Sequence, residues 1–373
     1  MKKTKVVIAS LLKPIDDTRM LDKFGLSIAE TNTYDVNIIG FDSKNIRAVD
    51  NITFHPLGSF SRLSISRLFK PIKVFNIYIK VKPKVIIANT HELLLVTLLY
   101  KILFGATFIY DVRENYAKNI RNTNVFPFLL KPFIAAWVRL KEWVTKPFVN
   151  HYILAERVYA NQLPFLSKHT TVIENKYMPL ARIDEKHTRN NSDNTTLVFT
   201  GTIADSNGIF EALSVTKSLY ELDDSIELKI VGYCALKSDL MRLKEEIKDL
   251  DYVSLNGGDH LVPHSEIVEA IQNADYGFVF KKGNNGMNDE KLLTRLFEYT
   301  ANKLPILLID NPHWIDFCET FNAAITMSPH SFVADDVIQQ MKSSEFYTKG
   351  DTSDSLWHTE APKLLSLISK QNP

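Results

Sequence analysis

Short apolar runs rich in valine and isoleucine alternate with helical stretches along almost the whole chain. In the first half these runs are KVVIAS (5–10), DVNIIG (35–40), KVIIAN (84–89), TFIYD (107–111), HYILA (151–155) and TTVIE (170–174). The second half repeats the pattern with TLVFT (196–200), IELKIVG (226–232), YVSLN (252–256), DYGFVF (275–280), LPILLID (304–310) and NAAITM (322–327). Nearly continuous apolarity is typical of strands that are buried on both faces of a parallel sheet. The alternation therefore predicts doubly wound α/β structure.

The length of 373 residues indicates two domains, at roughly 100–200 residues per domain. A polar stretch without apolar periodicity separates the two series of strands. We predict a Rossmann-like N-terminal domain at 1–178, a linker at 179–195 and a second Rossmann-like domain at 196–350. A helix within 351–373 closes the chain, and we expect it to pack back toward the N-terminal domain. Since ligands of open α/β sheets bind beyond the carboxyl ends of the strands, we expect a cleft where the two domains face each other.

Composition argues against several classes of protein. Hydrophobic residues make up 45% of the chain and charged residues 23%, as in globular proteins. A formal net charge of +1 argues against binding to nucleic acid. The two cysteines, Cys234 and Cys318, are far apart and have no metal-like spacing, so we expect reduced thiols in a cytoplasmic protein.

One apolar stretch, LLLVTLLYKILFGATFIY (93–110), reaches the length of about 18 residues that is typical of a membrane span. Gly105 divides it into a helical pattern and a β-rich run. We therefore expect a buried helix followed by a core strand rather than a span.

Two lysines, Lys281 and Lys282, follow the strand that ends at Phe280. A glycine-containing loop comes next, and we expect a helix to begin near Glu290. Glu290 and Glu298 lie eight positions apart, a rise of roughly 12 Å along a helix, so they could contact different parts of one elongated ligand. A carboxylate can accept hydrogen bonds from two hydroxyls of a ribose or hexose, and nearby cations can neutralise a diphosphate. An exposed charged helix without a ligand is the alternative.

The segment VFTGTIADSNGIFEAL (198–213) has the pattern of a strand, a turn and a helix that begins near Asn207. Gly201 and Gly208 permit a tight backbone, and the free N–H groups of a helix N-terminus can bind phosphate. The motif is neither a dinucleotide-binding fingerprint nor a Walker loop. A plain connection without a ligand is therefore the alternative.

The segment TRLFEYTANKLPILLID (294–310) resembles the donor-binding helix and following strand of the retaining glycosyltransferases of family 4, which have the GT-B fold. Glu290 and Glu298 match that family's two-glutamate signature, with seven residues between them. The resemblance continues at KPIDDTRMLDKFGLSIAE (13–30), FIYDVRENY (108–116), FTGTIADSNGI (199–209) and SLWHTEAPKLL (355–365), so it extends over nearly the whole chain. It departs from the family at Arg113, where many members have His, and at Asn207, where a basic residue is usual.

This resemblance implies transfer of a hexose-like sugar from a nucleotide sugar, such as a UDP- or GDP-sugar, with retention at the anomeric carbon. We predict no cofactor and no essential metal, because the sequence has no His/Cys cluster with the spacing of metal ligands. Glu298 would bind the ribose, and Glu290 would contact hydroxyls of the donor sugar. The implied donor-binding residues are Gly201, Thr202, Lys281, Lys282, Arg295, Leu296 and Glu298, with the three cations as candidates for the diphosphate. The candidates for catalysis are Glu290, Arg113, Glu114 and His91, and those for the acceptor side are Asp17 and Arg19. For His91, a capping or packing role is the alternative.

An aromatic and basic stretch at 125–149 places Phe133, Trp137, Leu140 and Val144 on one helical face. Such a helix can lie in a membrane interface, or it can be a core helix whose lysines reach out to solvent. Because the resemblance implies glycan or lipid-linked acceptors, we expect an enzyme of surface polysaccharide biosynthesis that is peripheral on the cytosolic face of the membrane. A non-catalytic GT-B partner subunit and a nucleotide-sugar epimerase are the alternatives.

Overall fold

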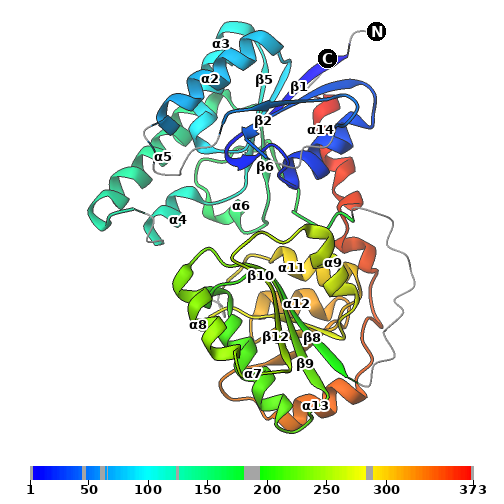
Figure 1. The fold of residues 1–373 in the computed structure, drawn as a ribbon. Coiled ribbons are helices and arrows are strands. Elements are labelled where there is room, and N and C mark those ends of the chain that lie inside the picture. Colours follow the sequence, from blue (N-terminus) through cyan, green and yellow to red (C-terminus); the bar gives the residue numbers. More distant parts are fainter. Residues whose placement is uncertain are drawn as a thin grey trace. The chain divides into compact units, whose positions relative to one another are not determined.

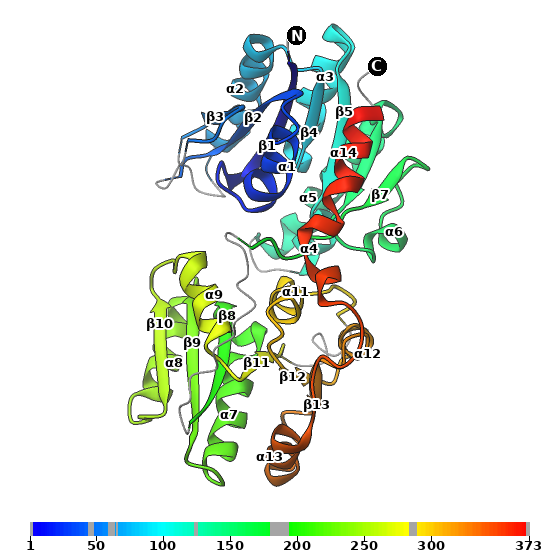
Figure 2. The same cartoon turned by 90° about the vertical axis from the view of Figure 1, so that its right-hand side faces the viewer.

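The computed structural model describes residues 3–43, 48–58, 64, 66–122, 126–179, 194–282 and 289–370. Two compact units make up the chain: the first contains Met1–Met178 and Trp357–Pro373, and the second contains Pro179–Leu356. Each unit is a parallel sheet with helices on both faces (Figure 1, Figure 2). The predicted α/β class with two doubly wound sheets is therefore confirmed. Most of the predicted linker, 180–193, lies outside the described residues.

Seven parallel strands form the sheet of the first unit. Their order is β3 (Ile52–Pro56), β2 (Tyr34–Phe41), β1 (Thr4–Pro14), β4 (Val85–Ala88), β5 (Thr107–Val112), β6 (His151–Leu154) and β7 (Thr170–Val172). Six of these coincide with predicted runs. The sequence pattern does not predict β3, because this edge strand buries only Ile52 and lacks a continuous apolar run.

The strands of the first unit are apolar throughout because both faces of the sheet are covered. Successive residues point to opposite faces of a strand, so Val7 packs in one core while Val6 and Ile8 pack in the other. The helices α2 (Ser66–Val81) and α3 (Leu94–Phe104) cover the first core, and α1 (Leu26–Ala29) and α14 (Ala361–Lys370) cover the second. The other helical segments of this unit are η1 (Arg19–Gly25, a π-helix), η2 (His91–Leu93), α4 (Tyr116–Asn122), η3 (Phe128–Leu130), α5 (Lys131–Thr145), η4 (Lys146–Phe148), α6 (Tyr159–Gln162) and η7 (Trp357–Thr359).

Six parallel strands form the sheet of the second unit, and each coincides with a predicted run. Their order is β10 (Val253–Gly258), β9 (Ile226–Tyr233), β8 (Thr195–Thr202), β11 (Tyr276–Val279), β12 (Ile306–Ile309) and β13 (Ala324–Met327). The helical segments are η5 (Asp205–Asn207), α7 (Ile209–Tyr220), α8 (Lys237–Ile247), α9 (His264–Gln272), α11 (Thr294–Ala301), α12 (Pro312–Glu319), α13 (Ala334–Ser343) and η6 (Thr352–Ser355).

The apolar stretch at 93–110 is a helix and a core strand, as predicted, but the helix is only partly buried, because side chains such as Leu99 and Ile102 are exposed. Helix α3 ends where Gly105 takes the left-handed conformation at φ +75°, and β5 begins at Thr107. In the described part of the chain, no helix combines the length and the apolarity that a membrane crossing requires. Both cysteines are free and buried.

The C-terminal segment is more broken than the single helix that the sequence predicts. The turns η6 and η7 precede α14, which begins only at Ala361. Trp357 anchors this segment within the first unit: its indole N–H donates to Ser27 Oγ at 2.9 Å, and its ring stacks on Phe24 at 5.7 Å.

Candidate functional site

The order of the strands identifies one point in the second unit where ligands are expected. β9 and β10 lie on one side of β8, whereas β11 to β13 lie on the other. The chain therefore adds strands first on one side of β8 and then on the other, and the switch point lies between β8 and β11. Open α/β sheets bind ligands beyond the carboxyl ends of the strands at this switch point. Four of the predicted residues lie there: Gly201 and Thr202 end β8, and Lys281 and Lys282 follow β11.

Three glycines stand side by side at the carboxyl ends of β8, β9 and β10. Gly201 pairs with Gly232, which pairs with Gly257. A Cβ atom on Gly232 would lie 1.8 Å from the Gly201 carbonyl oxygen, and one on Gly257 would lie 2.2 Å from the Gly232 carbonyl oxygen. Gly201 has φ +92°, and a Cβ atom there would have no described atom within 4 Å. This edge of the sheet therefore presents bare main chain, with open space over Gly201 where a ligand can approach the backbone.

The turn that follows β8 packs against the end of β11. Gly208 has φ +77°, and a Cβ atom there would lie 2.7 Å from Phe280 Cβ and 2.9 Å from the Lys281 backbone nitrogen. Only glycine fits this position, so Gly208 brings the start of α7 close to the two lysines. The helix begins at Ile209 after the short turn η5, not near Asn207 as predicted. The start of α7 and two lysines, each paired with an aspartate, thus lie together at this corner.

Lys282 and Arg242 form the cationic part of this corner. Lys282 Nζ lies 2.6 Å from Asp205 Oδ2, and its backbone N–H donates to the Ser206 carbonyl oxygen at 3.3 Å. Arg242 Nη1 lies 3.6 Å from Asp205 Oδ1, and its guanidinium stacks 3.7 Å from the centre of the Phe210 ring. The sequence pattern does not predict Arg242, because it lies on α8, far from any recognised motif.

The segment before α11 carries Glu290 and is not helical. α11 begins at Thr294, so the predicted helix start near Glu290 is wrong. Glu290 is exposed and directly follows Asp289, which pairs with Lys281. Asn311 Nδ2 donates to the Asp289 carbonyl oxygen at 3.1 Å, so the main chain beside Glu290 is held in place. Most of the glycine-containing loop, 283–288, lies outside the described residues.

Glu298 is the one acid of the pair that lies on α11. Its side chain is 21% exposed, and Oε1 lies 3.4 Å from Nε2 of His264, the first residue of α9. Asn302 Nδ2 donates to the Glu298 carbonyl oxygen at 2.8 Å and fixes the end of the helix. The carboxylate is thus partly open to solvent beside a histidine that nothing in the sequence pattern predicts.

Two predicted donor-binding residues have structural roles instead. Arg295 is buried: Nη1 donates to the Phe278 carbonyl oxygen at 3.1 Å, and the guanidinium lies 4.4 Å from the centre of the Phe199 ring. Burial lowers the pKa of Arg295. Leu296 lies in the hydrophobic core, and its N–H donates to the Leu293 carbonyl oxygen at 2.9 Å. Both residues therefore hold α11 against the sheet, and we withdraw them as ligand contacts.

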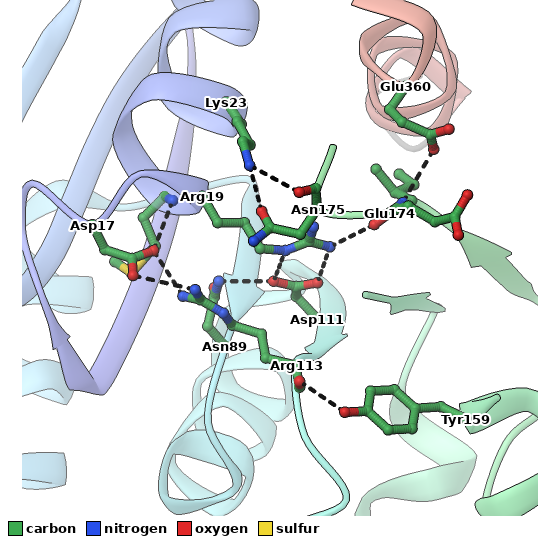
Figure 3. Close-up of polar contacts among 12 residues, drawn as sticks. Asp17, Arg19, Lys23, Asn89, Asp111, Arg113, Tyr159, Glu174, Asn175 and Glu360 are labelled. Atoms are coloured by element: carbon green, nitrogen blue, oxygen red, sulfur yellow. Dashed lines mark hydrogen bonds and ion pairs between the residues drawn. The ribbon is translucent and has the colours of Figure 1, made fainter. Parts of the chain in front are cut away.

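In the first unit, Arg19 is fully buried rather than open to an acceptor. Its Nε and Nη2 donate to Asp111 Oδ2 at 3.0 Å and Oδ1 at 2.8 Å, and Nη2 also donates to the Ile173 carbonyl oxygen at 3.0 Å (Figure 3). Asn89 Nδ2 donates to Asp111 Oδ2 at 2.9 Å. Arg19 thus ties η1 to the ends of β5 and β7, and the predicted acceptor role is withdrawn because no solvent-facing surface remains.

Asp17 and Arg113 form a second ion pair in the same region. Arg113 Nη1 donates to Asp17 Oδ1 at 2.8 Å and Nη2 to Oδ2 at 3.2 Å (Figure 3). Burial opposes ionisation of Asp17, but the charge and hydrogen bonds of Arg113 outweigh it, so the pKa of Asp17 lies below its usual value. Tyr159 Oη donates to the Arg113 carbonyl oxygen at 3.2 Å. Arg113 is therefore held in one position at the end of β5.

His91 lies directly beyond β4, as predicted, and contacts α5. Its Nδ1 lies 2.8 Å from Lys141 Nζ, and its ring packs edge-on against Tyr116 at 4.9 Å. Burial lowers the pKa of His91 to about 4 and that of Lys141 to about 8. At neutral pH, His91 is thus a neutral ring that accepts a hydrogen bond from a charged lysine. The fourth catalytic candidate, Glu114, accepts a hydrogen bond from Asn119 Nδ2 at 2.9 Å.

No group of three or more histidine, cysteine or acidic side chains within the described ranges could hold a metal ion. That the reaction needs no metal stays a prediction.

No protein-family model and no curated protein matches the chain. Solved structures do match. A sucrose-phosphate synthase from Thermosynechococcus elongatus matches with a TM-score of 0.71 and 12% identity, over 99% of this chain and 99% of its own. Anabaena HepE, solved with UDP and glucose, matches with a TM-score of 0.65 and 12% identity, over 98% of this chain and 99% of its own. Starch synthase IV from Arabidopsis thaliana, bound to ADP and acarbose, matches with a TM-score of 0.67 and 11% identity, over 100% of this chain and 99% of its catalytic domain.

These neighbours are GT-B glycosyltransferases. With two parallel α/β sheets and nearly complete coverage, the chain has the GT-B fold. The matches also include a putative UDP-N-acetylglucosamine 2-epimerase from Listeria monocytogenes, so the fold is shared by more than one activity.

Proposed function

We propose that the protein is a glycosyltransferase that takes its donor sugar from a nucleotide sugar, bound at the carboxyl ends of β8 and β11. The observation that carries this proposal is the junction of Gly201 and Lys282. Bare main chain with open space stands at the end of one strand, and a cation stands at the end of its neighbour. Phosphate groups bind where backbone N–H groups, a helix N-terminus and cationic side chains converge.

Each residue of the second unit that stays in the proposal has a separate task. Lys282 and Lys281 would exchange their aspartate partners for the diphosphate, which carries more charge. Lys282 is well suited to this exchange, because its side chain is 49% exposed and an exposed ion pair contributes little stability. Gly201 would let the diphosphate approach the main chain, and Thr202 lies exposed beside it.

The two glutamates would bind the sugars of the donor. Glu298 is partly buried on a fixed helix, which suits the two hydroxyls of a ribose. Glu290 is exposed on a segment whose main chain is held at Asp289, which suits the hydroxyls of the transferred sugar. Carboxylates near the reacting sugar also stabilise an oxocarbenium-like transition state.

The proposal extends to a glycan or lipid-linked acceptor, transfer with retention, a role in surface polysaccharide biosynthesis, and a cytoplasmic protein that contacts a membrane through 125–149. Asp17, Arg113, Glu114 and His91 are its acceptor-side and catalytic residues in the first unit. Asp17 and Arg113 are poised at the end of β5 by their ion pair. The resemblance to family 4 supports retention and the acceptor class.

A non-catalytic GT-B subunit is the second candidate. The observation that favours it is the Arg113–Asp17 ion pair, because a guanidinium fixed by a carboxylate replaces the histidine that the resemblance implies. An epimerase is the third candidate, since one structural neighbour is a putative epimerase.

The test is to incubate the protein with UDP-, GDP-, ADP- and CMP-sugars and to measure release of the free nucleotide. The anomer of the released sugar is then followed by proton NMR. A retaining transferase should release the nucleotide, a diphosphate from a UDP-, GDP- or ADP-sugar and CMP from a CMP-sugar, and should give the anomer of the donor first. Epimerisation would change the sugar while it stays attached to the nucleotide. Nucleotide binding without any turnover, with or without a lipid-linked acceptor, would support the non-catalytic subunit instead.

A further inference from the structure

The first unit exposes an apolar surface that the proposed nucleotide site does not use. Every exposed large hydrophobic side chain described in this unit lies on α2, α3 or α5, or on the short turns η3 and η4 that flank α5. Phe128 is 82% exposed, Phe133 is 74% exposed, and Phe69 and Ile102 are each 62% exposed. We name the exposed apolar side chains of these five segments the apolar platform.

The helices of the apolar platform belong to one layer. α2 and α3 lie side by side, and α3 in turn contacts α5 (Figure 1, Figure 2). Tyr100 of α3 packs against Tyr78 of α2 with ring centroids 5.5 Å apart. Helix α3 has an inner face in the core, with Leu94, and an outer face in water, with Leu95 and Leu99. A helix that is apolar all round is typical of complete burial, so a partner is expected to cover its outer face.

The charges of these segments are almost all positive. The segments 66–81, 94–104 and 128–148 contain nine lysines and arginines but a single acid, Glu142. Glu142 is 1% exposed, and its Oε2 accepts a hydrogen bond from Arg139 at 2.8 Å, so it offers no negative charge to a partner. Arg67 pairs with Glu92 of the adjoining turn η2, and Lys141 is buried, so the other lysines of these segments carry the excess positive charge.

The side chains of the platform combine cations with aromatic rings. Lys146 Nζ lies 4.8 Å from the centre of the Trp143 ring. Lys141 Nζ lies 5.7 Å from the centre of the Trp137 ring, but Lys141 is buried and its Nζ contacts His91. Tryptophan is enriched at the boundary between lipid headgroups and acyl chains, and nearby lysines attract anionic headgroups. Aliphatic and aromatic side chains on the same surface can enter the acyl region.

A second copy of the chain is a poor cover for this surface. A twofold interface would place the same patch on both sides, and cations would then face cations without a compensating acid.

We propose that the apolar platform is a docking surface for an anionic phospholipid bilayer. It is wider than the contact through 125–149 alone, because nine of the exposed large apolar side chains lie on α2 and α3. The argument uses no residue of the proposed nucleotide site.

The experiment is flotation of the full-length protein with vesicles of phosphatidylcholine alone, or of phosphatidylcholine mixed with phosphatidylglycerol. The wild type should float with the mixed vesicles, and raising the salt concentration should weaken its binding. The variants Phe69→Ser with Ile72→Ser on α2, and Ile102→Ser with Phe104→Ser on α3, should each weaken binding at least about tenfold. Lys146→Glu should also weaken it.

The matched control is Leu222→Ser with Leu261→Ser, which removes two exposed apolar side chains from the second unit. It should bind vesicles like the wild type. All substituted apolar side chains are exposed. Thermal unfolding of these variants should therefore stay unchanged, which separates a lipid effect from misfolding. Nucleotide titration of the same variants should be unaffected, which makes a failure here distinguishable from a failure of the proposed function.

Three results would overturn the proposal. The wild type could fail to float with either kind of vesicle. It could form a dimer that the α3 variant dissociates, in which case a second copy covers the platform. Binding could depend on α5 but not on the α2 and α3 variants, in which case the contact is confined to 125–149.

Discussion

The Arg19 guanidinium and the Asp111 carboxylate meet in a two-point ion pair, at 2.8 Å and 3.0 Å, with neither side chain open to solvent. The pair joins η1 to the end of β5, so it fixes the carboxyl edge of the first sheet (Figure 3). Removing one partner leaves the other charge buried and unpaired.

Asp111→Ala should therefore lower the free energy of unfolding by about 3–5 kcal/mol. Denaturant unfolding measures this loss. The double variant Arg19→Met with Asp111→Leu should be more stable than Asp111→Ala, because it leaves no unpaired charge in the core. If Asp111→Ala unfolds like the wild type, the pair has no structural role.

The Asp17–Arg113 pair should make stability depend on pH in the acidic range. The folded pKa of Asp17 lies below the ordinary value of 3.8, so its contribution is complete above pH 3.8 and is lost as the pH falls through the folded pKa. The difference in unfolding free energy between the wild type and Asp17→Asn should thus be constant near neutral pH and shrink below about pH 4. Denaturant unfolding of both proteins over the acidic range measures it. A difference that grows as the pH falls would show that the carboxylate is not stabilised by Arg113.

His91 should stay neutral well below the usual titration range of histidine. Its folded pKa is about 4 against an ordinary value of 6.5. Between these values the unfolded state binds more protons, so the stability from neutral His91 is lost as the pH falls from 6.5 to 4. Nitrogen-15 NMR of the imidazole rings, assigned with His91→Gln, measures the titration directly. A midpoint near 6.5 would mean that the ring is not held in its buried position beside Lys141.

If Lys282 binds the diphosphate, substitutions of Lys282 and of Asp205 should have opposite effects on diphosphate binding. Lys282→Ala should weaken binding of a nucleoside diphosphate by about tenfold or more, because a direct charged contact is lost. Asp205→Ala should leave binding unchanged or strengthen it, because it frees the lysine from its 2.6 Å ion pair. Both variants should unfold within about 1 kcal/mol of the wild type, since the pair is exposed. Equal weakening by both variants would instead indicate that the ion pair only shapes the turn.

The strands of this protein are predictable because a parallel sheet that is buried on both faces leaves a continuous apolar run. β1 and β8 show this, and the edge strand β3, with only Ile52 buried, shows the limit. The assignment of the two glutamates rests on their spacing and on the resemblance, and it stays a prediction.

The positions of individual cations are not predictable in the same way. The motif around α11 predicts that its basic residue contacts a ligand, yet Arg295 points inward and donates to the Phe278 carbonyl oxygen. Arg19 likewise points inward and pairs with Asp111. Whether a side chain on a helix points inward or outward depends on how the helix packs, which the spacing of residues in the sequence does not give. Conversely, Arg242 and His264 come to the site from helices with no motif, and only the fold brings them near Asp205 and Glu298.

The most direct test of the central claim is a calorimetric titration of the full-length protein with UDP, GDP, ADP and CMP, run beside Glu298→Ala. Glu319→Ala is the matched control, because Glu319 is an exposed acid at the last position of α12 in the same unit. The account predicts that one of the nucleotides binds the wild type and the control equally, and that Glu298→Ala loses the binding while remaining folded. Failure of the folded wild type to bind any of the four, or equal binding by Glu298→Ala, would contradict a nucleotide site at the end of β8 and β11.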